Sequence, residues 1–520
     1  MRKILVVSAC VLALTAAASA QQAGALQTAA TTLGVATVNT LEITGSGRNF
    51  ALGQNYTANE PWPAITVPTY TALVNYQTAS MRQELVRDQP SPTMPRGGGA
   101  PFMGQQRQIQ VVSGEFAWNV PPPAAPVAPE AGRVSLDQAL ATVGARPPAP
   151  AAQPAAANQV ERMLWLHATP QGFVKAAMAN NATTRGGRNN STEVSFTVSG
   201  RQVTGVINAQ GHVESVRSMI YHPIVGDMPI EARYTNYKDF GGVLFPTNVV
   251  QLQDGYPTLE LTISAVKANP AVAITVPDNV RAAATAPAAA PVETVTNQLL
   301  APGVQYLTGG SHHSLVVEMR DHLVVVDLPL AQARAEAVLG KAKELFPNKP
   351  VRYVVTGHHH WDHLGGIREA FAEGARIVTH QSNKALLERV AKAPHTLSPD
   401  RQATVKGKAQ IETVAAMREL KDATRTIQLH LMTGLDHTGD MLLVYLPAEK
   451  ILALADAYTP PGQAGQALTP PARAFAKNLY DNIQRLKLDV TTIAPFHGNR
   501  TVTMADLTRD SGAGAAPATN

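Results

Sequence analysis

The stretch TGHHHWDHLGG, residues 356–366, places four histidines and one aspartate within six consecutive positions. Imidazole nitrogens and carboxylate oxygens are ligands that zinc and related divalent ions accept. In an extended segment, side chains two residues apart point the same way. His358 and His360 can therefore reach one ion together, whereas His359 points elsewhere. The spacing predicts a metal site at this point of the chain.

Asp362 and His363 follow where the chain turns towards a helix, so they can face a second point close to the first. One loop supplies too few ligands for a complete site. Three further candidates each follow an apolar stretch, and these are His437, Asp456 and His497. Rigid elements that each end in a polar residue can present ligands together at one edge of a sheet. We therefore expect these side chains to gather there.

The elements that would present these ligands alternate in type. Buried strands are predicted over 322–329, 351–356, 375–380, 426–432, 440–447 and 450–458. Helices are predicted over 331–347, 365–374 and 381–393. Strands that alternate with helices predict an α/β layered domain, and three strands in a row at its end predict that the sheets are mixed.

These residues together resemble the metallo-β-lactamase superfamily, whose ligand classes all occur here and in the family's order. The matching residues are His358, His360, Asp362, His363, His437, Asp456 and His497. The resemblance covers about 300–505, and Asp327, which follows its strand, matches another acid of the family. It implies an αββα sandwich over 299–508, preceded by a mostly antiparallel β domain.

The resemblance also implies two zinc ions, with other divalent metals such as iron or manganese as alternatives. The first ion would be held by His358, His360 and His437. The second ion would be held by Asp362, His363 and His497, and Asp456 would bridge the two. Two nearby cations lower the pKa of a shared water, so a bridging hydroxide could attack a carbonyl or phosphorus centre. Asp362 would act as the catalytic residue that orients this nucleophile and moves its proton.

The expected function is an exported hydrolase that cleaves a small ester, lactone, thioester or amide. True β-lactamases of this fold usually carry cysteine or serine at the position of Asp456. β-Lactam hydrolysis therefore stays an alternative rather than the first expectation.

The segment 21–280 is predicted to be mostly β, with a Pro/Ala-rich insert near 119–157. Alternating apolar residues at 194–198, 201–207 and 258–269 indicate antiparallel strands joined by short turns. The stretch 232–269, which contains GGVLFP, resembles the half-barrel of lipoprotein carriers (LolA-like). In that family the concave face holds an acyl chain. The alternative function is therefore a lipid- or envelope-component-binding protein with a fused hydrolase domain.

The first twenty residues predict a bacterial secretory signal peptide, and hence a periplasmic or secreted protein. Arg2 and Lys3 precede an apolar run at 4–16, and Ala-Ser-Ala at 18–20 forms a cleavage site. Cys10, the only cysteine, would leave with this segment, so no disulfide is expected. No further stretch is long enough to predict a transmembrane segment.

The net charge indicates which class of partner to expect, and the local composition indicates where the domains end. The formal net charge is +5 without any Lys/Arg-rich run, so the expected partner is a small-molecule substrate and not nucleic acid. An Ala/Pro-rich linker is expected over 281–298 and a flexible tail over 509–520.

The other histidines are expected to be solvated or hydrogen-bonded residues without a metal role. They include His167, His212, His222, His312, His313, His380, His395 and His430. His380 ends a strand and could support a ligand from behind. Trp361 and Tyr458 flank ligands and could line the pocket or simply pack.

Overall fold

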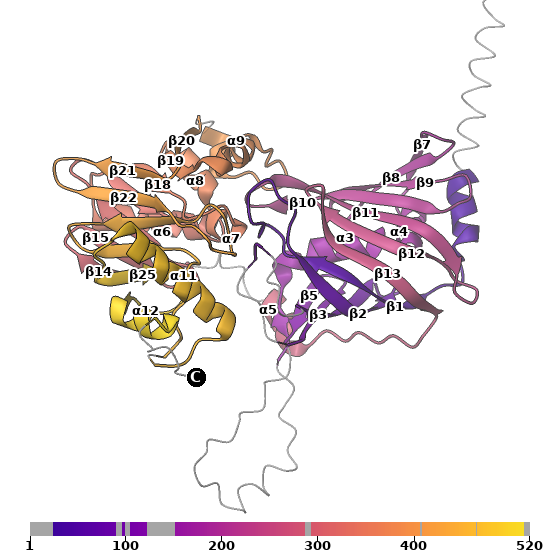
Figure 1. Cartoon of the computed structure of the whole chain (residues 1–520). Helices are drawn as coiled ribbons and strands as arrows, with labels where there is room; N and C mark the ends of the chain where they lie inside the picture. The colour runs from indigo at the N-terminus through magenta and orange to yellow at the C-terminus, as the bar shows by residue number, and fades with distance from the viewer. Residues whose placement is uncertain are drawn as a thin grey trace, which may run out of the picture.

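The computed structural model describes residues 24–89, 96–98, 104–121, 151–285, 293–405, 408–463 and 465–513. The expected signal peptide, residues 1–20, lies outside the described residues, as does most of the Pro/Ala-rich insert. In the described part of the chain, no helix is long and apolar enough to cross a membrane. Two lobes stand side by side, the N-terminal one in indigo and magenta and the C-terminal one in orange and yellow (Figure 1).

The N-terminal lobe is built on one antiparallel sheet of thirteen strands. In spatial order the strands are β6 (Gln153–Pro154), β5 (Phe116–Val120), β4 (Gln106–Ser113), β3 (Ser80–Asp88), β2 (Ala64–Asn75), β1 (Thr40–Phe50), β13 (Tyr256–Ala268), β12 (Leu244–Gln253), β11 (Gly226–Asp239), β10 (Val213–His222), β9 (Arg201–Ile207), β8 (Thr192–Val198) and β7 (Thr183–Gly186). The first strand in sequence, β1, pairs with the last, β13, and this pairing ties the two ends of the lobe together. The expectation of a mostly antiparallel β domain is confirmed.

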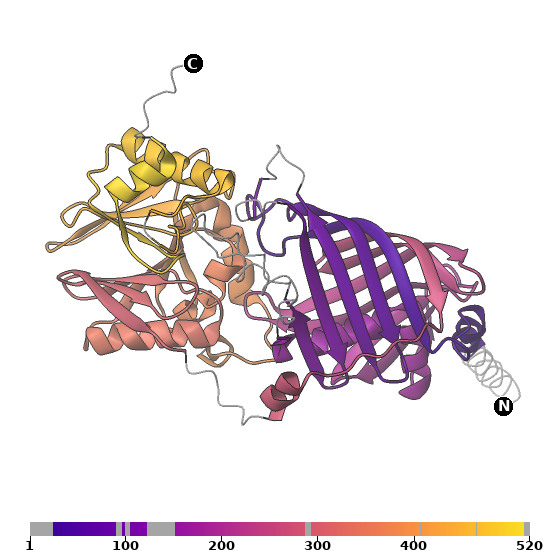
Figure 2. The ribbon, with the colours of Figure 1, turned by 90° about the horizontal axis from the view of Figure 1, so that it is seen from below.

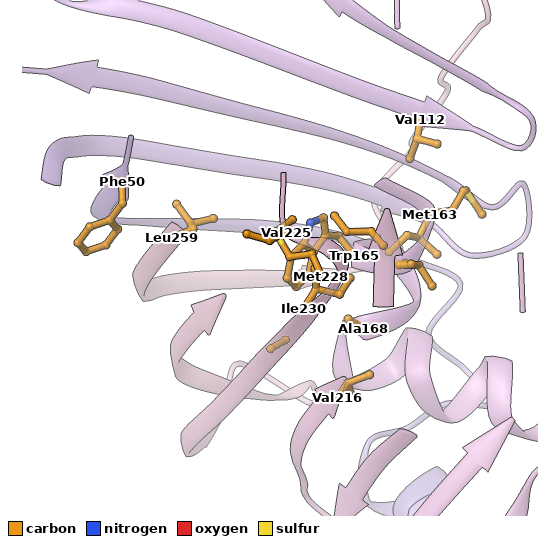
Figure 3. Packing of buried hydrophobic residues seen from close by; sticks show 14 of the residues in the cluster. Phe50, Val112, Met163, Trp165, Ala168, Val216, Val225, Met228, Ile230 and Leu259 are labelled. Carbon is orange, nitrogen blue, oxygen red and sulfur yellow. The ribbon is translucent and has the colours of Figure 1, made fainter. Parts of the chain in front are cut away.

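The sheet curves around a pair of helices. The helical elements of this lobe are residues 24–32, η1 (Ala156–Asn158), α3 (Gln159–Ala168), α4 (Pro170–Ala179) and α5 (Asp278–Thr285). Helix α3 touches both β4 and β10, which lie seven positions apart in the strand order, so the sheet must wrap around it. Figure 3 shows Trp165 of α3 packed near Met228 and Ile230 of β11.

The hollow beside α3 is polar. A cavity of about 340 Å³ is lined by several amide side chains, including those of Gln108, Gln110 and Gln251. The neighbouring apolar cavity, next to Met81 and Phe245, measures only about 30 Å³. An acyl chain needs a long apolar cavity, so the shape of this lobe gives the lipid expectation no support.

Two sheets form the C-terminal lobe. The first runs β14 (Thr296–Ala301), β15 (Val304–Thr308), β16 (Ser314–Glu318), β17 (Leu323–Val326), β18 (Val351–Val355), β19 (Arg376–His380) and β20 (Gln410–Val414). The second runs β21 (Met417–Lys421), β22 (Thr426–Leu431), β23 (Leu442–Leu446), β24 (Ile451–Leu454), β25 (Thr492–Pro495) and β26 (Val502–Thr503). Strands β17 to β20 pair in parallel, while the neighbouring β15, β16 and β17 pair antiparallel.

Helices cover the outer faces of both sheets (Figure 2). They are α6 (Gln332–Leu345), α7 (Trp361–Leu364), α8 (Ile367–Ala372), η2 (Gln381–Asn383), α9 (Lys384–Lys392), α10 (Arg401–Val405), α11 (Pro470–Leu486) and α12 (Met504–Ser511). Along β17, Leu323 and Val325 face the helix layer with Val338 of α6, while Val324 and Val326 face the second sheet. Both faces of the strand are buried, which explains its continuous apolar sequence. The layers are therefore αββα, as expected.

Two expected irregular segments contain regular structure at their ends. Helix α5 and strand β14 occupy residues 278–285 and 296–301, so both ends of the expected linker 281–298 are ordered. Helix α12 continues into the expected tail and ends at Ser511. There Tyr458 donates a hydrogen bond to the Asp510 carboxylate (2.6 Å), which fixes the helix against the domain. The alanine-rich composition that indicated a linker also suits helix α5, because alanine is a good helix former.

Candidate metal centre

The histidine-rich stretch leaves strand β18 and turns into helix α7. The backbone N–H of Gly357 donates to the Asp327 carboxylate (2.6 Å), which follows the neighbouring strand β17. His360 has extended backbone (φ −61°, ψ 146°), and α7 begins at Trp361. Asp362 therefore sits in the first turn of that helix.

The structure brings the seven residues of the expected ligand set together in two adjacent clusters. The first cluster consists of His358, His360, His437 and Asp456. The second consists of His312, Asp362, His363 and His497. In each cluster, one ligand-type atom per residue lies within 4.8 Å of all the others. This spacing suits one cation per cluster.

Asp456 lies between the clusters and offers one carboxylate oxygen to each. Its Oδ1 is 2.6 Å from Nε2 of His363 and 2.9 Å from Nε2 of His497. Its Oδ2 is 3.1 Å from Nε2 of His437. The neighbouring imidazoles hold the pKa of this carboxyl well below its usual range, although burial alone would raise it.

Ring nitrogens of neighbouring histidines face one another in pairs, as ligands of a shared cation do. The Nε2 atoms of His358 and His437 face each other at 3.2 Å, and those of His363 and His497 at 3.1 Å. The Nδ1 atoms of His358 and His360 are buried without a hydrogen-bond partner. A buried polar atom without a partner is costly, so Nδ1 of His360 fits a ligand role, whereas His358 faces the cluster with its Nε2.

Burial and neighbouring charges shift the pKa values of the three imidazole rings in different directions. Burial lowers the pKa of His358 and of His360, and neighbouring histidines lower it further. Both rings are therefore neutral and able to bind a cation. Burial would also lower the pKa of His363, but the Asp456 and Asp327 carboxylates raise it well above the usual value. The Nδ1 of His363 lies 2.8 Å from Asp327, which fixes its orientation.

His359 turns away from both clusters, as expected. Its Nδ1 lies 2.9 Å from the Asp440 carboxylate and its Nε2 lies 3.1 Å from the Asn55 side chain. The ring is buried, so its role is in the packing behind the site.

His312 differs from its expectation as an ordinary histidine. Its Nε2 lies 3.1 Å from Oδ2 of Asp362, and its backbone forms a β-bridge with His497. The only local signal was the His-His pair at 312–313 shortly before a strand, which by itself predicts nothing specific. His313 contacts the same loop, donating to the Gly498 carbonyl (2.7 Å).

The N-terminal lobe also reaches the clusters, which sequence reasoning missed completely. Gln54 donates to Oδ1 of Asp362 (2.7 Å), and His360 donates to the carbonyl of Asn55 (2.8 Å). No motif marks these residues, because they belong to an ordinary polar loop.

The remaining candidates have structural roles. Trp361 packs against Trp62 and His222 of the N-terminal lobe, and Tyr458 is fully buried. His380 accepts a hydrogen bond from the backbone of Ser382 and does not support a ligand. The others contact neighbours outside both clusters. His212 stacks on Tyr237, His395 lies near Asp400, and His430 contacts Gln428.

Residues 307–497 match the model of the metallo-β-lactamase superfamily. The C-terminal region therefore carries a domain of that superfamily. No curated protein matches the chain.

Solved metallo-β-lactamases are similar to this chain. One from Pontibacter korlensis is 19% identical, covering 42% of this chain and 98% of that chain, with a TM-score of 0.33. FIM-1 from Pseudomonas aeruginosa, in its mono-zinc form, is 17% identical. The match covers 43% of this chain and 96% of FIM-1, with a TM-score of 0.33. One from Hirschia baltica is 20% identical. The match covers 42% of this chain and 96% of that chain, with a TM-score of 0.32.

Proposed function

We propose that this protein is an exported, dinuclear zinc-dependent hydrolase that cleaves a small ester, lactone, thioester or amide. The division of the Asp456 carboxylate between two histidine clusters carries the proposal, because a shared carboxylate is what two adjacent cations require. The leader-type sequence at residues 1–20 supports export.

The donor set fits such ions. Imidazole nitrogens and carboxylate oxygens suit zinc, and the unpartnered Nδ1 of His360 would gain a partner. Bound ions would supply Lewis acidity towards a substrate oxygen and would lower the pKa of a nearby water.

Asp362 is placed to take up the proton of an attacking water. Its side chain is 30% exposed, whereas that of the adjacent His363 is fully buried, so solvent reaches this carboxylate. Gln54 contacts one of its oxygens and His312 contacts the other, so the orientation of the carboxylate is fixed. A carboxylate fixed in this way keeps the geometry that proton transfer requires.

Metal analysis of purified protein tests the first part of the proposal. We expect about two equivalents of a divalent transition metal per chain, as the two clusters imply. A chelator should remove them together with all hydrolytic activity. Less than one equivalent of any transition metal would overturn the proposal.

A hydrolysis panel on zinc-loaded protein tests the second part. The panel contains lactones, esters, thioesters, amides, β-lactams and phosphodiesters, and the His437→Ala variant serves as the inactive control. Turnover confined to β-lactams would replace the proposed substrate class with the alternative. Turnover of none of these substrates would overturn the hydrolase proposal.

A further inference from the structure

The segment between β1 and β2, residues 51–63, which we call the β1–β2 loop, leaves the N-terminal sheet and runs over the metal centre. Residues 96–98 lie beside it, and Gly98 N–H donates to the Gln54 carbonyl (2.7 Å). The two segments therefore form one surface that faces the C-terminal domain.

This surface holds three of the expected ligands from the side opposite the clusters. Gln54 binds Oδ1 of Asp362, while Oδ2 faces His312. The Asn55 carbonyl binds Nε2 of His360, whose Nδ1 has no partner. The Gly98 carbonyl accepts from Nδ1 of His437, whose Nε2 faces the cluster. In each case the N-terminal lobe contacts one atom of the side chain, and the other atom is left to the cluster.

Such contacts orient ligands and fix imidazole tautomers, and they are worth tenfold to hundredfold in metal affinity. A carbonyl accepts only from a protonated nitrogen, so Asn55 and Gly98 keep the proton on the atom that points away from the cluster.

The loop is a fixed part of the molecule. Gly439 N–H donates to the Tyr56 carbonyl (2.9 Å), and Gly97 N–H donates to the Asp436 carbonyl (2.8 Å). These bonds flank His437 on both sides. Gly53 lies against Trp361, and a Cβ built at Gly53 would come within 2.3 Å of the indole. These contacts join the loop to the chain around His437 and to the Trp361 side chain.

We propose that the metal centre is a joint site of the two domains, in which the β1–β2 loop is a permanent wall and Gln54 is a positioning residue for Asp362. The catalytic consequence rests on the proposed hydrolase function, but the effect on metal binding does not.

The Gln54→Met variant of the full chain tests the positioning role. Methionine preserves length and volume but removes the amide that holds Asp362. Zinc titration against a competing chelator should show one equivalent bound about tenfold to hundredfold more weakly, with the other unchanged. With an active substrate, kcat should fall more than KM changes. Gln298→Met, at an exposed position on β14, is the matched control and should behave as wild type.

If Gln54 had only a structural role, the variant would have a lower melting temperature, and its affinities for the two zinc equivalents would change by the same factor. That result, or wild-type affinity for both equivalents, would overturn the assignment. If the titration behaves as expected while no substrate turns over, the joint site stands and the hydrolase proposal fails.

The Gly53→Ala variant tests the wall. Gly53 has φ +69°, and Gly241 has φ +78° with open space around it, so alanine strains the backbone at both. The methyl group of alanine at position 53 would overlap the Trp361 side chain, whereas at position 241 it would meet no neighbour within 4 Å. We expect Gly53→Ala to weaken zinc binding in both clusters at least tenfold and Gly241→Ala to leave it unchanged. Equal zinc affinities in the two variants would overturn the wall.

Discussion

Behind the metal centre, a buried polar network surrounds Asp440. Its carboxylate contacts His359 and accepts from Asn383 and Thr438. Burial would raise the pKa of Asp440, but His359 and these hydrogen bonds hold it low. The carboxylate is therefore charged and depends on its partners. Residue 359 belongs to this network although it sits between two expected ligands.

The His359→Ala variant should retain metal and lose stability. Removing the ring leaves a buried carboxylate short of one partner, which costs about 2–3 kcal/mol. Metal content per chain should equal that of wild type, while the urea midpoint falls. His360→Ala, the contrasting variant, should lose metal. Loss of metal from His359→Ala would contradict the division of roles.

Helix α6 secures the chain that carries His312. Arg334 is fully buried and donates to the carbonyls of Thr294, Thr308 and His312, at 2.9, 3.1 and 3.2 Å. One side chain thus links the helix to the segments at both ends of the β14–β15 hairpin. The position of His312 beside Asp362 depends on this link.

Arg334→Met should destabilise the protein by about 2–5 kcal/mol, because three carbonyls lose their donor in a buried place. The midpoint of urea unfolding reports the change. Arg352→Met removes an exposed arginine paired with Asp321 and serves as the control, expected within about 0.5 kcal/mol of wild type. Equal effects of the two variants would contradict the role of Arg334.

Across the molecule, the two lobes share one apolar cluster. It includes Trp62 and Trp361, whose rings lie 5.6 Å apart, and it continues from the N-terminal core to the helix layer beside β17. His222, at the end of β10, also packs on Trp361, and its Nδ1 accepts from Ile224 N–H (3.3 Å). Burial, aided by His395, lowers the pKa of His222 to about 4.

This junction should weaken in acid. His222 is neutral in the folded protein down to about pH 4, but in the unfolded chain it binds a proton below about pH 6.5. Its contribution to stability is therefore lost as pH falls from about 6.5 to 4. His222→Asn should reduce the drop in unfolding free energy between pH 7.5 and pH 5.0 by about 2 kcal/mol. Urea unfolding at pH 7.5 and 5.0 measures this, and identical drops in the two proteins would refute it.

The sequence by itself determined the layers of the C-terminal domain and the residues that gather at its edge. Strands such as 323–326 are apolar on both faces, and that pattern is local in the chain. Residues that directly follow such strands lie at the end of a sheet, so the positions of His358 after β18 and Asp456 after β24 were predictable. Their role as metal ligands stays a prediction.

Only the tertiary structure decided what surrounds those residues. Gln54 lies 308 positions from Asp362 in sequence, and neither it nor Asn55 carries any periodic or motif signal. His312 likewise acquires its partner only when β15 and the loop after β25 close on each other. Contacts of this kind depend on how two domains dock, and docking follows from the shapes of folded surfaces and not from any local pattern of residue types.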